Sequence, residues 1–324
     1  MSARFASLGE LVVELFRPDV DQPFDQTGVF LGPYASGAPA IFIDALAKLG
    51  CACSYSATVG SDAFGEFLTQ RLAADGVDVS GIHRVEGFAT GLAVTMFRRD
   101  GSRSFIYHLR QAAPGQFGPQ HLDVTSLAQA DFLHISANVL AFSSSAREAC
   151  YRALRVVTDA GGRVSFDPNI RPEMMSRDEV WELCAPVVKA AYVILPSGVE
   201  ARMLTGAGGD EAACRQLVEM GVRYVVLKEG RNGSTVFTAR ERVHAPAYQV
   251  TELDPTGAGD CYDAGFVYGL AQGWDAGRCA QFGNALGAMT VQVCGPMEGF
   301  SRLADVVSFM QHTPFVASSE YVEP

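Results

Sequence analysis

Strand-like runs alternate with amphipathic helical stretches along most of this chain of 324 residues. The pattern predicts an α/β fold of three layers, because parallel strands need helical crossovers and these cover both faces of the sheet. The expected strands are 6–15, 54–59, 132–136, 163–166, 192–195, 224–228 and 234–238. The expected helices are 38–49, 63–74, 144–160, 177–190, 199–205, 210–220, 259–271 and 276–293.

A predicted hairpin interrupts this alternation. The strand-like runs 91–98 and 103–109 are joined by Arg99-Asp-Gly-Ser102, and an Asp-Gly pair supplies the positive φ angles of a tight turn. Together with the extended segment 16–34, the hairpin predicts a small β layer that projects from the main domain. We expect lid segments at about 16–34 and 88–110. Residues 313–324 show no helical periodicity and are expected to form a loose tail.

Composition narrows the class of protein. Hydrophobic residues make up 48%, which suits a folded domain, and 25 basic against 36 acidic residues give a net charge of −11. Such a chain repels a phosphate backbone or an anionic membrane surface, so we expect no nucleic acid and no membrane partner. No run approaches the ~20 apolar residues of a membrane span, and residues 1–15 lack a signal-peptide pattern, which predicts a cytoplasmic protein. The eight cysteines are scattered and form neither a disulfide framework nor a zinc pattern.

The segment from Asp254 to Asp260, Asp-Pro-Thr-Gly-Ala-Gly-Asp, carries the clearest chemical signal. Glycines let the backbone approach a ligand closely, and the free N–H groups at a helix N-terminus favour an anion. Asp260 falls in the first helical turn, where its carboxylate could remove a proton from a substrate hydroxyl. The segment therefore predicts a site for phosphoryl transfer.

This segment resembles, at every fixed position, the C-terminal signature of the ribokinase-like (PfkB) carbohydrate kinases. The runs 36–50 and 59–65 are similar to the family's N-terminal signature. The resemblance implies a ribokinase-like domain over residues 1–312 with the lid inserted, and ATP-dependent phosphorylation of a sugar hydroxyl. It also implies Asp260 as general base, the amides of Gly257, Ala258 and Gly259 as the anion hole, and Mg²⁺.

The same resemblance implies further residues for the nucleotide and its metal. Glu200 would organise Mg²⁺ together with the phosphates, although Ser197 replaces the Asn that usually precedes it in the family. Arg171 would lie near the phosphate or the acceptor, and a monovalent cation such as K⁺ is a candidate near Asp254 and Gly295. The residues expected to contact ATP or its metal are Asn169, Glu200, Lys228, Gly230, Gly233, Thr256 and Asn284.

For the sugar, the resemblance points to Glu14, Gly37 and Ala38. Ile41 stands where the family commonly has Asn, so Asp44, one turn along the same helix, is either a substitute sugar ligand or a solvated helix residue. Tyr107, Arg110 and Arg171 suit an acidic sugar if the two arginines converge; otherwise Arg110 is an outward-facing charge of the lid.

The segments 32–44 and 295–299 look most like those of bacterial tagatose kinases, and fructokinases are close behind. We therefore expect a ketohexose, tagatose or fructose, as the acceptor. The alternatives are a 2-keto-3-deoxygluconate kinase, a ribokinase or another member of the fold such as a nucleoside kinase. A catalytically silent sugar-binding regulator would be expected to lack the base or the glycine loop, and both are present. An extended β lid is a natural contact surface, so a homodimer through the lid is expected.

Overall fold

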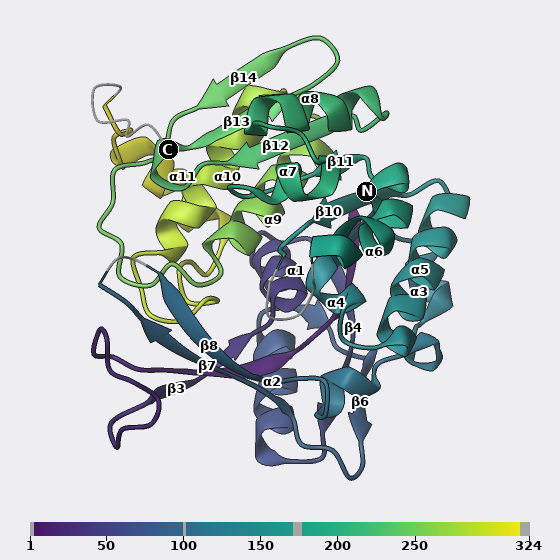
Figure 1. Ribbon diagram of the computed structural model, residues 1–324, viewed down its shortest axis with the longest axis vertical. Coiled ribbons are helices and arrows are strands. Elements are labelled where there is room, and N and C mark those ends of the chain that lie inside the picture. Colours follow the sequence, from purple (N-terminus) through teal and green to yellow (C-terminus); the bar gives the residue numbers. More distant parts are fainter. Residues whose placement is uncertain (1–2, 100–101, 171–176, 318–324) are drawn as a thin grey trace.

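The structure is a computed structural model and describes residues 3–99, 102–170 and 177–317. Its main sheet consists of β1 (Arg4–Gly9), β4 (Ala52–Gly60), β5 (Val77–Asp78), β6 (Ile82–Val85), β9 (Phe132–Ser136), β10 (Arg163–Asp167), β11 (Val193–Ile194), β12 (Tyr224–Lys228), β13 (Ser234–Phe237) and β14 (Arg242–Ala245). The order is β14-β13-β12-β11-β10-β9-β1-β4-β5, with β6 also paired to β4 (Figure 1). All pairs are parallel except β12–β13 and β13–β14.

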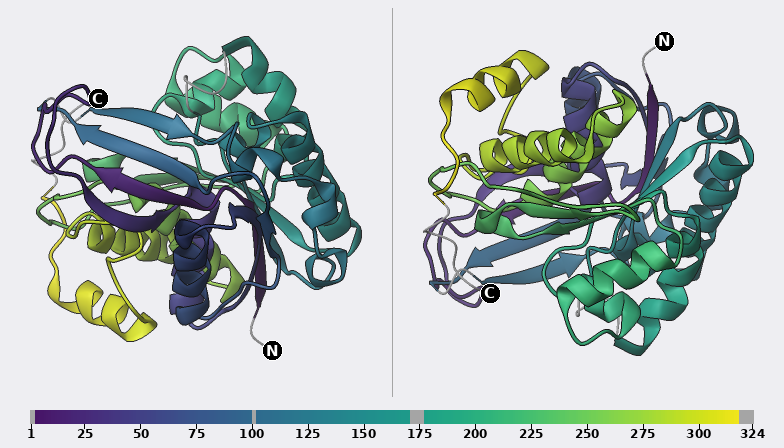
Figure 2. Two further views of the ribbon diagram at one scale, coloured as in Figure 1. Left: turned by 90° about the horizontal axis from the view of Figure 1, so that it is seen from below. Right: turned by 90° about the horizontal axis from the view of Figure 1, so that it is seen from above.

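Helices cover both faces of this sheet (Figure 2). One face carries α1 (Ala38–Lys48), α2 (Ala63–Ala74), α9 (Ala258–Ala271), α10 (Ala276–Thr290) and α11 (Leu303–His312). The other carries α3 (Val124–Leu127), α4 (Ala137–Leu140), α5 (Ser144–Asp159), α6 (Arg177–Ala190), α7 (Glu200–Thr205) and α8 (Asp210–Glu219). Two apolar cores result, with Phe42 and Phe266 buried in one and Phe166 in the other. The predicted three-layer α/β fold is confirmed.

A second sheet projects from the main domain (Figure 1). It consists of β2 (Val12–Phe16), β3 (Leu31–Ser36), β7 (Gly91–Phe97) and β8 (Arg103–His108), in the order β3-β2-β7-β8. This sheet, called the lid below, contains the predicted hairpin as the antiparallel pair β7–β8. The Asp-Gly step of its turn, residues 100–101, lies outside the described residues.

The strand predicted over residues 6–15 is two strands in two different sheets. β1 belongs to the main sheet and β2 to the lid. The break comes at Gly9, whose φ is +140° and where a Cβ atom would lie 2.5 Å from a methyl group of Val139. Apolar residues on both sides of the break made the segment look continuous. The turn matters because it sends the chain from one sheet into the other.

The beginning of the C-terminal tail is held in place, contrary to the prediction of a loose segment. Gln249 N donates to Pro314 O at 2.8 Å and Val316 N donates to Ala247 O at 2.9 Å. The rings of Tyr248 and Phe315 lie 4.7 Å apart between these bonds. Short pairing with a distant segment leaves no periodicity to detect. Residues 318–324 lie outside the described residues.

The structure also contains elements that the sequence pattern did not predict, among them α11, α3, α4 and the short strands β5, β6 and β14. Within the described ranges, no helix is both long and apolar enough to cross a membrane.

Candidate active site

A cleft of about 250 Å³ lies where the carboxyl edge of the main sheet faces the lid. Ligands of open α/β sheets bind at this edge, where the loops after parallel strands come together. The lining residues from the main domain are Glu10, Gly37, Ala38, Ile41, Asn138, Asp167, Asn169, Ser197, Glu200, Lys228, Pro255, Thr256, Gly257, Gly259 and Asp260. Those from the lid are Val12, Glu14, Ser36, Ala93, Arg103, Phe105 and Tyr107, with Leu109 directly after β8.

The glycine loop and Asp260 lie together in this cleft, at the N-terminus of α9. Gly257 caps the helix with a φ of +79°, and a Cβ there would lie 2.6 Å from Cβ of Pro296, so both the turn and the packing require glycine. Gly257, Gly259 and Asp260 line the cleft, and Asn169 Nδ2 lies 3.5 Å from Asp260 Oδ1. The carboxylate can accept a proton, and the N–H groups of the helix N-terminus beside it can bind an anion.

Glu200, Asp167 and Asn169 form an oxygen-rich wall of the cleft. Glu200 accepts hydrogen bonds from the backbone N–H groups of Ile170 at 2.8 Å and Ser197 at 2.6 Å. Ser197 thus holds Glu200 through its backbone N–H, which any residue except proline could do at this position. Carboxylate and amide oxygens are the ligands that Mg²⁺ prefers, so this wall suits a nucleotide-bound Mg²⁺. Arg171, expected nearby, lies outside the described residues.

Lys228 lies beneath the glycine loop rather than on an open surface. Its Nζ lies 3.0 Å from both carboxylate oxygens of Asp263 and 3.4 Å from Asp167 Oδ1. A Cβ placed on Gly259 would lie 3.5 Å from the same nitrogen. Burial lowers the pKa of Lys228, but the neighbouring carboxylates outweigh it and the pKa is raised. The ammonium therefore stays charged next to the first turn of α9.

Gly233 and Asn284, expected at the nucleotide, meet at one backbone segment outside this cleft. Asn284 Nδ2 donates to Ala245 O and Pro246 O, both at 3.0 Å. Gly233 has a φ of +92°, and a Cβ there would lie 2.1 Å from Ala245 O. Gly230 begins the short turn of 3₁₀ helix Gly230–Asn232 beside them. Their contact with adenosine stays a prediction.

Glu14 lies in the lid and faces the cleft with both oxygens engaged. Ser36 Oγ donates to Oε2 and Thr95 Oγ1 donates to Oε1, each at 2.7 Å. Burial raises the pKa of Glu14 above its ordinary value, although these two hydroxyls oppose the shift. Gly37 and Ala38 line the cleft beside it. The residues matched to the sugar-binding loop therefore surround one volume.

Sequence reasoning missed Glu10 and Asn138, which complete that volume. Glu10 Oε1 accepts hydrogen bonds from Asn138 Nδ2 at 2.6 Å and from Ala38 N at 3.2 Å. Glu10 directly follows β1, and Asn138 lies two residues after β9, the neighbour of β1 in the sheet. The strand predicted over 132–136 could have pointed to Asn138, whereas the strand predicted over 6–15 placed Glu10 inside a strand and hid it.

Strand β8 presents alternate side chains to the cleft. Arg103, Phe105 and Tyr107 line it, and the rings of Phe105 and Tyr107 stack at 5.2 Å. Arg110 lies beyond the end of the strand, is exposed and does not line the cleft, which corrects its expected place as a ligand of an acidic sugar. Arg103 is the lid arginine that reaches the cleft, because strand alternation puts it on the face of Tyr107.

Asp44 is neither a substitute sugar ligand nor a solvated helix residue. It is 1% exposed and forms an ion pair with Lys48 Nζ at 2.7 Å, with an Nη atom of Arg71 at 3.9 Å. It does not line the cleft. The side chain one turn along α1 from Ile41 therefore points between helices, and Asp44 is not a substitute sugar ligand in this structure.

Asp254 and Gly295, expected near a monovalent cation, are in direct contact. Asp254 Oδ2 accepts from Gly295 N at 3.0 Å, and Oδ1 accepts from Thr256 N at 2.9 Å. The buried carboxylate thus joins the loop of Gly295 to the start of the glycine loop. The cation itself stays a prediction.

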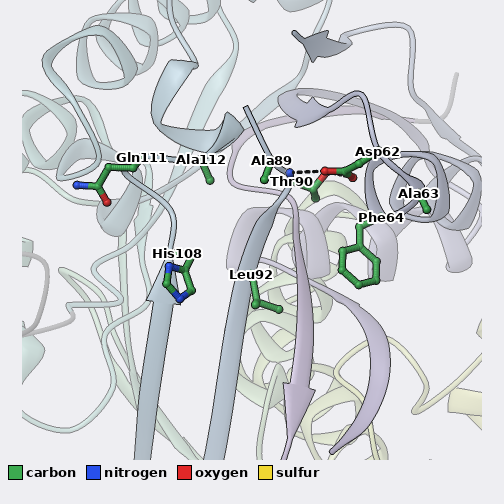
Figure 3. A pocket seen from close by; sticks show the side chains of 9 residues that line it. All are labelled: Asp62, Ala63, Phe64, Ala89, Thr90, Leu92, His108, Gln111 and Ala112. Carbon is green, nitrogen blue, oxygen red and sulfur yellow. Dashed lines mark hydrogen bonds between the residues drawn. The ribbon is translucent and has the colours of Figure 1, made fainter. Parts of the chain in front are cut away.

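A second hollow, of about 600 Å³, lies on the opposite face of the lid (Figure 3). Leu92 and His108 face it from β7 and β8, and Phe64 faces it from the first turn of α2. Asp62 also lines it and is hydrogen-bonded to Thr90. None of the predicted site residues lines this hollow.

Comparisons with known proteins agree with this geometry. A putative ribokinase II from E. coli, solved with ATP and Mg²⁺, is 40% identical, with a TM-score of 0.90 over 96% of this chain and 99% of that one. A fructokinase from Vibrio cholerae O395, solved with fructose, ADP and calcium, is 27% identical, with a TM-score of 0.83 over 95% and 99% of the two chains. The 5-dehydro-2-deoxygluconokinase of Clostridium perfringens is 29% identical over 88% of this chain and 86% of that protein.

The pfkB family of carbohydrate kinases matches residues 3–302, which is nearly the whole described chain. The match includes the lid, the glycine loop and Asp260. The chain therefore belongs to the pfkB family of carbohydrate kinases and is an ATP-dependent sugar phosphotransferase.

Proposed function

We propose that the acceptor is a neutral ketohexose, tagatose or fructose. The observation that carries this proposal is the pair of buried carboxylates Glu10 and Glu14, which line the sugar side of the cleft on the same volume as Asp260. Carboxylates accept hydrogen bonds from several hydroxyls of a neutral sugar. They repel a substrate that carries a carboxylate of its own.

In the proposed reaction, the acceptor hydroxyl lies between Glu14 and Asp260. Asp260 takes the hydroxyl proton as the sugar oxygen attacks the γ-phosphorus, and the amides of Gly257, Ala258 and Gly259 stabilise the charge on the transferred group. Asp167, Asn169 and Glu200 would hold the Mg²⁺ that accompanies ATP, and the ion would supply charge neutralisation at the phosphates. The lid excludes water, which suppresses hydrolysis of ATP.

An acidic sugar is the second candidate. The relative named 5-dehydro-2-deoxygluconokinase favours it, as does Arg103, a cation that lines the cleft. Arg110 cannot assist from its place outside the cleft. The two carboxylates of Glu10 and Glu14 outnumber the single arginine, Arg103, and this balance favours the neutral sugar. Ribose is a third acceptor to test, and a silent sugar-binding regulator predicts no turnover with any sugar.

The test is ATP turnover by the purified protein with tagatose, fructose, ribose, 2-keto-3-deoxygluconate and 5-keto-2-deoxygluconate. We expect kcat/KM for tagatose or fructose to exceed that for either acid by about tenfold or more, equivalent to about 1.4 kcal/mol. A higher kcat/KM for an acid contradicts the ketohexose proposal and supports the acidic sugar.

We also propose that two copies pair through the outer face of the lid. Leu15, Val94 and Ile106 are neighbours in register across β2, β7 and β8, and Ile106 is 39% exposed. Such an apolar row on a projecting sheet is a suitable contact for a second copy. Sedimentation at micromolar concentration is expected to give a dimer, and Ile106→Glu a monomer. A monomeric parent contradicts the pairing.

The predicted K⁺ is likewise proposed near Asp254 and Gly295. The support is that the Asp254 carboxylate ties the loop of Gly295 to Thr256 at the anion hole. Turnover in potassium chloride is expected to exceed turnover in tetramethylammonium chloride at equal ionic strength. Equal rates contradict a requirement for the cation.

A further inference from the structure

Arg103 is the one lid cation that lines the cleft among the residues that the structure describes. It begins β8, directly after the hairpin turn, so it lies at the tip of the lid. Its guanidinium reaches the main domain, where Nη1 lies 3.4 Å from Thr256 Oγ1. The two residues are 153 positions apart, so this contact spans the cleft from the lid to the glycine loop.

Thr256, the partner of Arg103 in this contact, lies at the start of the glycine loop. Thr256 directly precedes Gly257, the N-cap of α9, and its own backbone N–H is held by Asp254 at 2.9 Å. A guanidinium beside Thr256 therefore lies at the rim of the anion hole. It lies on the side from which the lid covers the cleft, whereas Lys228 lies beneath the hole.

The surroundings of Arg103 keep the guanidinium in the cleft. Its Cζ atom lies 5.4 Å from the centroid of the Phe105 ring, within reach of a cation–π contact, and Phe105 in turn stacks on Tyr107. The side chain is partly buried, and its charge lowers the pKa of Glu14 against the larger effect of burial. Arg103 thus lines the same cleft as Glu14 and contacts Thr256 at the start of the glycine loop.

We propose that Arg103 contacts the phosphoryl group during its transfer and is a catalytic residue supplied by the lid. In this step the bond between the γ-phosphorus and the β–γ bridging oxygen breaks, and its electrons leave with ADP. The bond from the sugar oxygen to the phosphorus forms, and the hydroxyl proton goes to Asp260. A planar guanidinium can donate two hydrogen bonds to the equatorial oxygens, which the backbone amides below contact only from one side.

This inference concerns the transferred phosphoryl group and rests on the proposed function only for the choice of acceptor. The experiment therefore uses whichever sugar in the panel above is the best acceptor. Failure of the ketohexose proposal changes the sugar in the assay and leaves the question about Arg103 intact.

The variants are Arg103→Gln, which removes the charge, and Arg103→Ala, which opens space for added guanidinium. The matched control is Arg98→Gln in the same hairpin, because Arg98 donates to Ser104 Oγ at 2.8 Å and does not line the cleft. We expect Arg103→Gln to lower kcat by about 10²-fold or more, the usual loss for one donor to a developing anion, with a sugar KM within about threefold of the parent. Guanidinium is expected to restore part of the activity of Arg103→Ala, while Arg98→Gln is expected to match the parent.

A binding measurement separates contact with the phosphoryl group from loss of folding or of lid closure. ADP with Mg²⁺ and aluminium fluoride mimics the group in transfer, and calorimetry reports its affinity in the presence of sugar. We expect Arg103→Gln to bind ADP as the parent does and to lose most of the additional affinity that the fluoride complex confers. A kcat within about threefold of the parent, a loss confined to sugar KM, or unchanged affinity for the fluoride complex would each overturn the proposal.

Discussion

Asp62 holds Thr90 by both its backbone and its side chain: Oδ2 accepts from Thr90 N at 2.8 Å and Oδ1 accepts from Thr90 Oγ1 at 2.6 Å. Oδ1 also accepts from Gly65 N at 2.9 Å, so Asp62 is the N-cap of α2. Because β7 begins at Gly91, this single carboxylate joins a helix of the main domain to the first residue before the lid hairpin. Figure 3 shows this bond between two of the residues that line the second hollow.

Thr90→Val is expected to weaken this junction. It removes the side-chain donor to a charged carboxylate and the acceptor for Gly60 N, so we expect a loss of about 1.5–3 kcal/mol in the free energy of unfolding. Urea unfolding of parent and variant measures it. Thr69→Val is the matched control, because the Thr69 hydroxyl donates to Gly65 O within α2. Equal losses in the two variants would contradict a special role for Thr90.

Asp260→Asn is expected to lower turnover by about 10²- to 10⁴-fold, because the amide is nearly the same shape and cannot accept the hydroxyl proton. Binding of ATP is expected to stay within a few-fold of the parent. The control is Asp275→Asn at the N-cap of α10, which lies outside the cleft. Turnover of Asp260→Asn within about threefold of the parent would show that Asp260 is not the base.

Glu14→Gln and Arg110→Ala separate the two classes of acceptor. With a neutral ketohexose, Glu14→Gln is expected to lower kcat/KM by about tenfold or more, since a hydrogen bond to a charged group contributes about 1.5–3 kcal/mol. Arg110→Ala is expected to change kcat/KM little, because Arg110 is exposed and outside the cleft. A large loss from Arg110→Ala with none from Glu14→Gln would refute the ketohexose.

The buried ring of His134 is expected to make the stability of the fold depend on pH. Its ring is 1% exposed, stacks on Phe42 at 3.8 Å and bonds through Nδ1 with Ser165 Oγ, and burial lowers its pKa to about 3. The unfolded chain binds a proton here below about pH 6.5, whereas the folded chain does not until about pH 3. Stability is therefore expected to fall as pH drops from 6.5 towards 3.

His134→Phe keeps an aromatic ring against Phe42 and removes the titrating group. Urea unfolding at several pH values is expected to give a smaller decrease of stability with falling pH for the variant than for the parent. The change in the pH slope is the readout, because absolute stability also responds to the loss of the bond to Ser165. Identical slopes would show that His134 does not contribute to the acid sensitivity.

Residues close together in the sequence were enough to predict many of the helices and strands and the turn of the glycine loop. Helix Ala63–Ala74 and strands Phe132–Ser136 and Tyr224–Lys228 have the predicted bounds, because their apolar periodicity and capping residues lie within a few positions of one another. The turn at Gly257 and the first turn of α9 likewise depend on adjacent residues. The local pattern was therefore enough to place Asp260 in the first turn of α9, beside the glycine loop.

The set of polar side chains that share the cleft with Asp260 depends on contacts between distant parts of the chain. Asp44 and Arg110 were predicted as sugar ligands from their positions in the sequence. Asp44 instead pairs with Lys48, and Arg110 lies beyond the end of β8 and points outward. Glu10 and Arg103 reach the cleft because Gly9 sends the chain from the main sheet into the lid and because the lid tip meets Thr256. Such contacts join residues far apart in the chain, and their geometry follows from how two sheets pack, which no local pattern encodes.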